Sequence, residues 1–522
     1  EIPSTGKWYA ECKWVSGSNM GVIGIVQRSH SESSNLGQGS YGYGYASSGS
    51  FQHNGSDAGS PASYANGDII GIYVDSDAGS VEFFKNGVSQ GTNWSSGLTS
   101  YPYYFAVSDG SSGGTGEFLW WFDGFEYTPP AGAKSLNTPV ATRPIIVRPT
   151  DHCGFTTYMG NGGKQFIELG FQPDLVWTKA RNASSGGGWN WTDSINGGDK
   201  YLMTNNSNTL GTYSAGKGVS FDKTGVTLSD VAGGDENLNG SSGGTYAGTW
   251  GYLMYAWKAG GNKGAFNKDD VEYPSAAAAG LASKSNVAIS HCSINTKAQF
   301  SMLKYYRTSD VNAEVSHGLE GKPDFIIWKC TEDAYNWDIW HSSLSMLKTL
   351  TMTSDNVRSG AIHQMPNETT IPVTDSYTGG STSNQDTMAY IWKFTPGYSA
   401  GGHYVGNSSD DGPVIECGFE PGWILFKKID GSSAWSAFNP ECNGSPGDDS
   451  QPMMNPQNMM IHTTLTAAQG PDAWAQLDIL PNGFKIRGQW APINTSDSDG
   501  LIWVAFARNS TTTLFGGQSL SM

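Results

Sequence analysis

Short apolar runs separated by polar turns recur along the whole chain, and none of them has a helical period. Residues 8–14 (WYAECKW) read as a strand, because successive side chains of a strand point to opposite faces. Residues 67–91 hold two apolar strands around a polar turn, followed by Asn86-Gly87, a pair typical of a tight type I′ hairpin. The pattern predicts an all-β protein.

Three later segments repeat one pattern of apolar and polar positions. Each has a proline, an apolar run, a lysine six residues after the proline, and a tryptophan further on. The equivalent residues are Pro173, Pro323 and Pro421, then Lys179, Lys329 and Lys427, then Trp189, Trp337 and Trp435. The recurrence predicts that the prolines occupy equivalent turns, that the runs are central strands covered on both faces, and that the tryptophans are core residues.

These patterns divide the chain into an N-terminal β-sandwich and three tandem β-sandwich-like repeats. Each repeat opens and closes with an apolar strand and has roughly the length of a small β-sandwich. The expected domains are a sandwich at 1–128, a Pro-rich linker at 129–149, repeats at 150–262, 286–399 and 400–510, a second linker at 263–285, and a tail at 511–522.

Composition narrows the class of protein further. Among 522 residues, 69 are Gly and 23 are Pro, and aromatic residues make up 12%, which argues against both a disordered chain and a coiled coil. The net charge is −17 and no Lys/Arg cluster is visible, so we expect no nucleic-acid partner. The longest apolar runs, such as 501–507, are far shorter than the roughly 18 residues of a membrane-spanning helix, so we expect no membrane insertion.

Six cysteines lie far apart in the sequence, and none forms a CxxC motif. We expect free, mostly buried thiols in a protein made in a reducing cytoplasm. The chain begins at Glu1 and not at Met, so we expect a processed form or a piece of something longer.

The segments GKWYAECKW, GVIGIV, YGYGYASSG and 67–91 resemble the SPRY-like, concanavalin-like sandwich domains of tailed bacteriophages. The remainder is similar to a tandem β-repeat of uncharacterised function that follows such a domain in marine phage virion proteins. The motifs that carry this likeness are FTTYMGNGG, GFQPDLVWTK, TWGYLMYAWKAGG, GFEPGWILFKK and LPNGFKIRG. The second repeat departs from the pattern, because LKYYRTSD replaces the usual glycines of the opening strand. The resemblance implies a virion fibre or other exposed appendage, with no established catalytic residues.

Paired carboxylates are the candidate catalytic groups, since glycosidases need two carboxyl groups within about 5 to 9.5 Å. The pairs are Asp75 with Asp77, Asp269 with Asp270, Asp410 with Asp411, and Asp497 with Asp499. All lie in polar, turn-like stretches, where Asp is favoured for local hydrogen bonds to the backbone. Asp75 and Asp77 could also bind calcium, but the rest of a calcium loop is missing. We expect no enzyme activity, no cofactor and no metal site.

A ligand-binding site is predicted in the N-terminal sandwich, because it is the one module that is not repeated. The candidate residues are Tyr41, Tyr43, Tyr45, His53 and Asn54, which combine aromatic faces with hydrogen-bonding groups. The alternative is that the three tyrosines face the interior of the sandwich.

Together these observations favour a non-enzymatic structural and adhesive component of a phage virion, such as a tail fibre, that attaches to a host surface or glycan. The expected location is the virion, after synthesis in the host cytoplasm. The expected partners are further copies of the chain, with a trimer as the form common in fibres, other virion proteins, and a host-surface glycan or protein. Two alternatives are a glycan depolymerase and a subunit of a non-viral extracellular filament or sheath.

Overall fold

The computed structural model forms two compact units, Glu1–Val140 (unit 1) and Ala141–Met522 (unit 2). It describes residues 2–3, 5–17, 21–27, 35–91, 94, 97–98, 103–109, 116–122, 124–136, 146–182, 188–229, 238–240, 250–282, 287–307, 312–344, 348–353, 357–359, 362–374, 384–429, 433–440, 442, 455–463, 465, 469–471, 475–497 and 499–510. The tail at 511–522 and residues 137–145 of the expected first linker lie outside these ranges.

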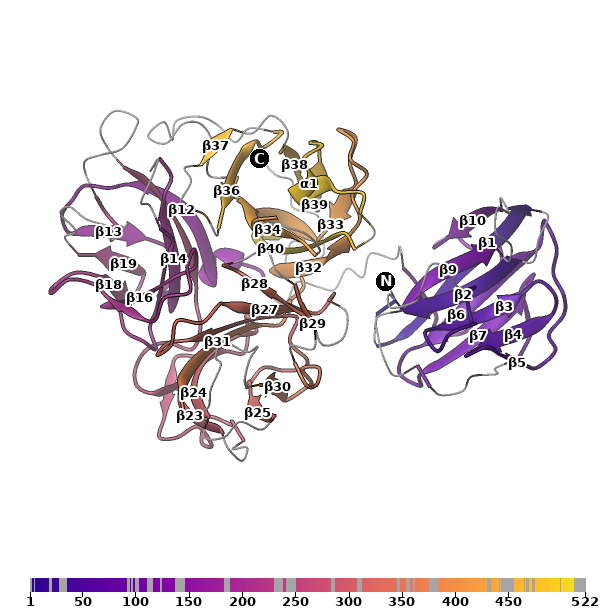
Figure 1. The fold of residues 1–522 in the computed structure, drawn as a ribbon, viewed down its shortest axis with the longest axis horizontal. Coiled ribbons are helices and arrows are strands. Elements are labelled where there is room, and N and C mark those ends of the chain that lie inside the picture. Colours follow the sequence, from indigo (N-terminus) through magenta and orange to yellow (C-terminus); the bar gives the residue numbers. More distant parts are fainter. Residues whose placement is uncertain are drawn as a thin grey trace. The chain divides into compact units, whose positions relative to one another are not determined.

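Nearly all regular structure in these ranges is β, as the sequence predicts (Figure 1). The helical segments within them are a single 3-10 turn, η1 (Pro149–Asp151), and one short helix, α1 (Ala491–Asn494). Neither is long and apolar enough to cross a membrane.

Unit 1 is a sandwich of two mainly antiparallel sheets. One sheet has the order β5-β4-β3-β2-β9, from β5 (Ser56–Ala58), β4 (Ser50–His53), β3 (Gly42–Ala46), β2 (Gly21–Gln27) and β9 (Tyr103–Asp109). The other has the order β10-β1-β6-β7-β8, from β10 (Glu117–Trp121), β1 (Lys7–Ser16), β6 (Ile69–Asp75), β7 (Ser80–Lys85) and β8 (Val88–Ser89). The hairpin between β7 and β8 turns at Asn86 (φ 48°) and Gly87 (φ 77°), as the Asn-Gly signal predicts.

Unit 2 contains three modules, and each has a large sheet with the same strand order. In module 1 the order is β12-β20-β14-β15-β16-β17, from β12 (Cys153–Met159), β20 (Gly251–Trp257), β14 (Leu175–Ala180), β15 (Asn190–Asp193), β16 (Lys200–Met203) and β17 (Gly211–Thr212). Module 2 follows with β24-β31-β26-β27-β28-β29, from β24 (Phe300–Arg307), β31 (Asp386–Trp392), β26 (Phe325–Cys330), β27 (Asp338–His341), β28 (Lys348–Thr351) and β29 (Val357–Ser359). Module 3 has β32-β40-β34-β35-β36-β37, from β32 (Ser399–Tyr404), β40 (Leu501–Ser510), β34 (Phe419–Lys428), β35 (Ser436–Phe438), β36 (Met459–His462) and β37 (Gly470–Pro471).

A small second sheet accompanies each large sheet. These are β13-β19-β18 in module 1 (Gln165–Glu168, Gly225–Leu228, Val219–Asp222), β25-β30 in module 2 (Ala313–Ser316, Thr370–Val373), and β33-β39-β38 in module 3 (Val414–Glu416, Gly483–Ile486, Leu477–Leu480). Apolar residues of the small and large sheets form a separate buried cluster in each module. Each module is therefore a two-layered sandwich.

The registers show that the three modules are equivalent residue by residue. Leu175 lies opposite Trp257, Phe325 opposite Trp392, and Trp423 opposite Phe506. Pro173, Pro323 and Pro421 each precede these residues by two positions, so they occupy equivalent places. Pro173 and Pro323 lie just before β14 and β26, whereas Pro421 lies inside β34 between two irregularities of the register, so the turn expected there is part of a strand. All three strands are central and paired on both sides.

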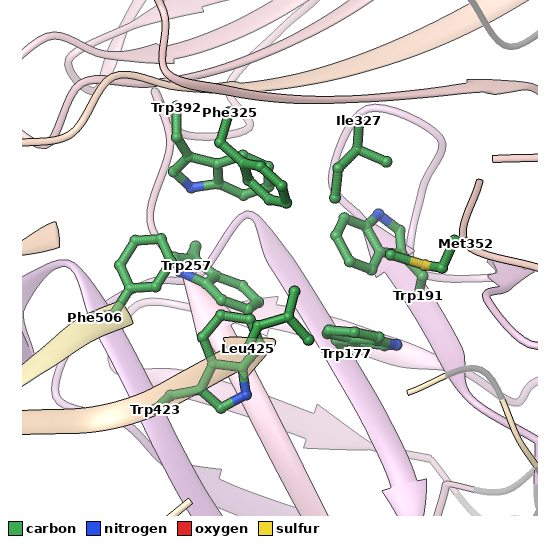
Figure 2. Close-up of a pocket in the computed structure, with 10 residues that line it drawn as sticks. All are labelled: Trp177, Trp191, Trp257, Phe325, Ile327, Met352, Trp392, Trp423, Leu425 and Phe506. Atoms are coloured by element: carbon green, nitrogen blue, oxygen red, sulfur yellow. The ribbon is translucent and has the colours of Figure 1, made fainter. Parts of the chain in front are cut away.

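The inner faces of the three large sheets share a single core rich in aromatic residues, which joins the modules into one body. In β14, Leu175 and Trp177 belong to this shared core, whereas Val176 and Ala180 belong to the core of module 1. This explains why the central strands are continuous apolar runs, because both of their faces are covered. Where the sheets meet, a cavity of about 10 Å³ remains among apolar side chains of all three modules (Figure 2).

The three repeated tryptophans are core residues, as predicted, and each one also binds the neighbouring module. Each side chain donates its indole N–H to a backbone carbonyl: Trp189 to His462 (2.8 Å), Trp337 to Met203 (3.1 Å), and Trp435 to Thr351 (3.0 Å). Module 1 thus binds module 3, module 3 binds module 2, and module 2 binds module 1. The three repeats therefore form a closed ring, in which each module contacts both of the others.

Two segments expected to be linkers have regular structure. Within 263–285, β21 (Phe266–Lys268) and β22 (Val271–Tyr273) extend the sheet of module 2 beyond β23 (Val287–Asn295). Within 129–149, β11 (Lys134–Ser135) pairs with β1 of unit 1. The prolines and glycines there limit the length of the strands but do not prevent pairing at a sheet edge.

Candidate interaction surface

The Tyr-rich strand β3 divides its aromatic rings between the interior and the surface of unit 1. Tyr43 and Tyr45 are 5% and 0% exposed and belong to the core, whereas Tyr41, just before β3, is 45% exposed. The Tyr43 hydroxyl donates to the carbonyl of Gly97, and the Tyr45 hydroxyl to that of Ala62. The alternative interpretation, that the tyrosines face the interior, therefore holds for Tyr43 and Tyr45, and of the three tyrosines Tyr41 alone is exposed.

His53 is held at the edge of this core in a defined orientation. Its ring stacks on Tyr43, with centroids 4.0 Å apart and planes 2° from parallel, and Trp94 contacts it edge-on. Its Nδ1 lies 2.8 Å from the carbonyl oxygen of Gly42. Because a carbonyl only accepts, Nδ1 is the donor of this hydrogen bond. Tyr43 thus positions His53.

Asn54 has a backbone role that the sequence prediction missed. Its φ is 53° and that of Gly55 is 69°, so the pair forms the turn between β4 and β5. The Asn-Gly pair was the available signal, since it is typical of such a turn. The Asn54 N–H donates to the carbonyl of Gly39, which brings the segment 37–41 beside this turn. The Asn54 side chain remains exposed.

The five candidate residues therefore separate into two groups. Tyr41, His53 and Asn54 lie close together, next to exposed Gln38 and Ser40; we call these five residues the Tyr41 surface. Tyr43 and Tyr45 belong to the core, and Tyr43 contacts the Tyr41 surface through His53. The Tyr41 surface combines one aromatic face with hydroxyl, amide and imidazole groups, a set that suits a sugar or another polar ligand. Ligand binding there stays a prediction.

The paired carboxylates have local structural partners. Asp75 forms an ion pair with Lys7 and accepts the N–H of Ala78, and Asp77 accepts the N–H of Gly6. The other pairs are alike: Asp270 binds Lys258, Asp411 binds Lys485, and Asp497 binds Lys428. These contacts agree with the interpretation of the pairs as turn residues. Among the described residues, no group of three His, Cys, Asp or Glu side chains could hold a metal ion.

The repeated lysines are fully buried. The motif places each of them at the end of an apolar run, but a charged residue in that position was not predicted to be buried. Lys179, Lys329 and Lys427 are each 0% exposed. Burial lowers the pKa of Lys179 and of Lys329 to about 8. The Lys329 ammonium donates to the carbonyls of Cys330 and of Ser207, which belongs to module 1. At this position the lysine helps to join modules.

In unit 1 a buried carboxylate, Glu11, joins two segments of the same domain. Glu11 is 0% exposed and accepts hydrogen bonds from the N–H groups of Glu126 and Tyr127 and from the Tyr9 hydroxyl. It ties the segment after β10 across the outer face of β1, where Phe125 packs edge-on against Tyr9 at 5.0 Å. The sandwich continues past residue 128, since β11 pairs with β1.

These features define an all-β protein with an N-terminal β-sandwich followed by a ring of three modules. Residues 7–118 match the SPRY domain family. Residues 148–510 match a family described as a domain of unknown function, DUF7483. The second match covers more than half of the chain, so the chain belongs to that family and carries a SPRY domain in front of it.

Two solved structures are similar to part of the chain. The SPRY domain of human HERC1 is 20% identical, with a TM-score of 0.21, over 22% of this chain and 74% of that chain. Stonustoxin is 21% identical, with a TM-score of 0.18, over 22% of this chain and 20% of that chain. A comparison with curated proteins gives no match.

Proposed function

We propose that the chain is a non-enzymatic structural and adhesive protein of a bacteriophage virion, a tail fibre or another surface appendage. In this proposal the three-module ring is the rigid body, and the SPRY domain attaches to a host-surface glycan through the Tyr41 surface. Support comes from the phage-like motifs in the sequence, from the ring-shaped repeat body and from the exposed aromatic and polar groups on unit 1.

The observation that carries the adhesive role is the arrangement at His53. Stacking on Tyr43 and the hydrogen bond to Gly42 hold the His53 ring in one orientation, next in sequence to the exposed Asn54. A pre-oriented group loses little conformational entropy on binding. One aromatic ring still provides only weak binding, so useful attachment requires several copies on one particle, where avidity multiplies affinity by roughly 10²–10⁴.

The test measures binding of the full chain to immobilised bacterial surface polysaccharides and to whole host cells. Tyr41→Ala and His53→Ala should each weaken binding by about three- to tenfold, the range expected for one aromatic contact. Val88→Ala is the matched control, since Val88 is 65% exposed on the same unit but lies on β8, in the other sheet. Equal binding by all variants would contradict the assignment of this surface.

A second measurement separates adhesion from the depolymerase alternative. The full chain is incubated with the same polysaccharides, and the release of reducing ends is followed at catalytic protein concentrations. We expect no release, because the paired carboxylates are occupied by lysines and backbone amides. Steady release would contradict the non-enzymatic role. Labelling of intact particles with an antibody to the chain then tests the virion location against a non-viral filament.

A further inference from the structure

The three large sheets differ at one edge, where their opening strands lie. In module 2 the opening strand β24 is covered by β23, which pairs antiparallel with it from Val287 to Asn295. In modules 1 and 3 the equivalent strands β12 and β32 are the last strands of their sheets in the described part of the chain. The second module thus shows what fits such an edge: an antiparallel, extended strand.

The two uncovered edge strands lack the residues that usually protect a free edge. Natural edge strands usually carry charges or prolines that prevent pairing with another chain. The covered strand β24 contains Lys304 and Arg307, whereas β12 (CGFTTYM) and β32 (SAGGHY) contain no charged residue and no proline. Residues 154–157 of β12 are also partly exposed. An uncharged, accessible edge is suited to strand addition.

We propose that β12 pairs with β12 of a second copy of this chain, antiparallel about a two-fold axis at Thr156. This register places Gly154 opposite Tyr158 of the partner copy, and Phe155 opposite Thr157 of the partner copy. Aromatic residues pair well with glycine and with β-branched residues across strands. The same operation on β32 sets Gly401 opposite Gly402, which offers no side-chain contact, so β12 is the better edge.

Two-fold pairing also agrees with the closed ring inside unit 2. One chain already supplies the three sheets that surround the shared core, so no further chain is needed to cover that core. The two-fold contact is self-complementary and closes as a dimer, whereas pairing β12 with β32 would leave open ends. This proposal concerns assembly and does not depend on glycan binding by unit 1.

The test uses the full chain with Thr157→Lys. Thr157 of module 1 and Lys304 of module 2 occupy equivalent positions, because they lie opposite Leu253 and Met388 in their sheets. Module 2 therefore shows that this fold accepts a lysine at this position. In the proposed dimer the two new lysines lie diagonally opposed on one face and repel each other. Ala277→Lys, which adds the same charge on an exposed turn outside these strands, is the matched control.

Sedimentation over a range of concentrations should show a dimer for the wild type and for Ala277→Lys, and at least about tenfold weaker association for Thr157→Lys. Hydrogen exchange of the β12 amides should slow as the wild-type concentration rises. A chain that stays monomeric at its highest soluble concentration, a trimer, or a dimer that Thr157→Lys leaves unchanged would each overturn the proposal. Neither lysine substitution changes a residue of the Tyr41 surface. Glycan binding by the two variants, measured where the chain is monomeric, therefore tests the proposed function independently of the dimer.

Discussion

Unit 1 and unit 2 use similar strands in different ways. In unit 1 the inner faces of two sheets enclose one main core, and outer positions such as Tyr73 and Glu82 remain only partly buried. In unit 2 the large sheets are covered on both faces, by a small sheet outside and by the shared core inside. The comparison teaches that repetition changes the role of a strand, because neighbouring copies can cover a face that a single sandwich leaves to solvent.

The shared core should make the modules unfold together, independently of unit 1. Trp337→Ala removes a fully buried ring and the hydrogen bond to Met203, and should lower the free energy of unfolding of unit 2 by about 3–5 kcal/mol. Calorimetry should show one unit 2 transition moving to lower temperature while the unit 1 transition stays in place. Tyr45→Ala should lower the transition temperature of unit 1 and leave that of unit 2 in place. Separate transitions for the three modules would show that the ring is not cooperative.

Acid should weaken unit 2 through His152, which lies where the three modules meet. It contacts Asn295 of module 2 and Tyr398 of module 3, and burial, with Lys297 and Lys258 nearby, lowers its pKa to about 4. The folded state therefore binds fewer protons than the unfolded state between pH 4 and 6.5, so the free energy of unfolding falls as the pH is lowered through this window.

The His152 effect is up to about 3 kcal/mol and should disappear in His152→Asn, whose side-chain oxygen replaces Nδ1 as an acceptor. The comparison with wild type is needed because Asp174 acts in the opposite direction: burial raises its pKa to about 6. Denaturant unfolding of both proteins at several pH values measures the difference. Parallel pH profiles would rule out the effect of His152.

Glu11→Ala should loosen unit 1 alone. It leaves the partly buried N–H groups of Glu126 and Tyr127 without their acceptor, at a cost of about 1 kcal/mol in the free energy of unfolding of unit 1. Limited proteolysis should then cut within 122–135 faster, with unit 2 unchanged. Glu11→Gln keeps one acceptor oxygen and should be intermediate. Unaltered proteolysis of Glu11→Ala would mean that this carboxylate does not hold the segment.

The smallest effect should distinguish the surface tyrosine from the buried ones. Tyr41→Ala should change the free energy of unfolding of unit 1 by no more than about 0.5 kcal/mol, as is usual for an exposed position. Tyr43→Ala should cost several times more, because it removes a core ring and the stacking partner of His53. Thermal melts of both variants measure this, and equal losses would contradict the division between surface and support.

Much of the fold could be predicted because its signals are local. The Asn86-Gly87 turn, the apolar runs after Pro173, Pro323 and Pro421, and the burial of Trp189, Trp337 and Trp435 follow from residue type and spacing. The linker predictions were less successful, because short strands at a sheet edge depend on a partner strand, such as β23 for β21, and not on their own composition.

The candidate site could be located only in part. Alternation correctly placed Tyr43 and Tyr45 on one face, but alternation alone does not say whether that face is inside or outside. The stacking of His53 on Tyr43 joins two strands, so it becomes visible only when the register of β3 and β4 is known.

The sequence by itself determined the β class, the number of repeats and the equivalence of their motifs, because these depend on periodicity and turn chemistry within each segment. Only the tertiary structure decided that the repeats close into a ring, that the three lysines are buried, and which tyrosine reaches the surface. The physical reason is that burial of a strand face depends on what packs against it. In this chain the residues that cover the inner faces lie in another module, on the order of a hundred residues away, as expected for stacked repeats of sandwich size.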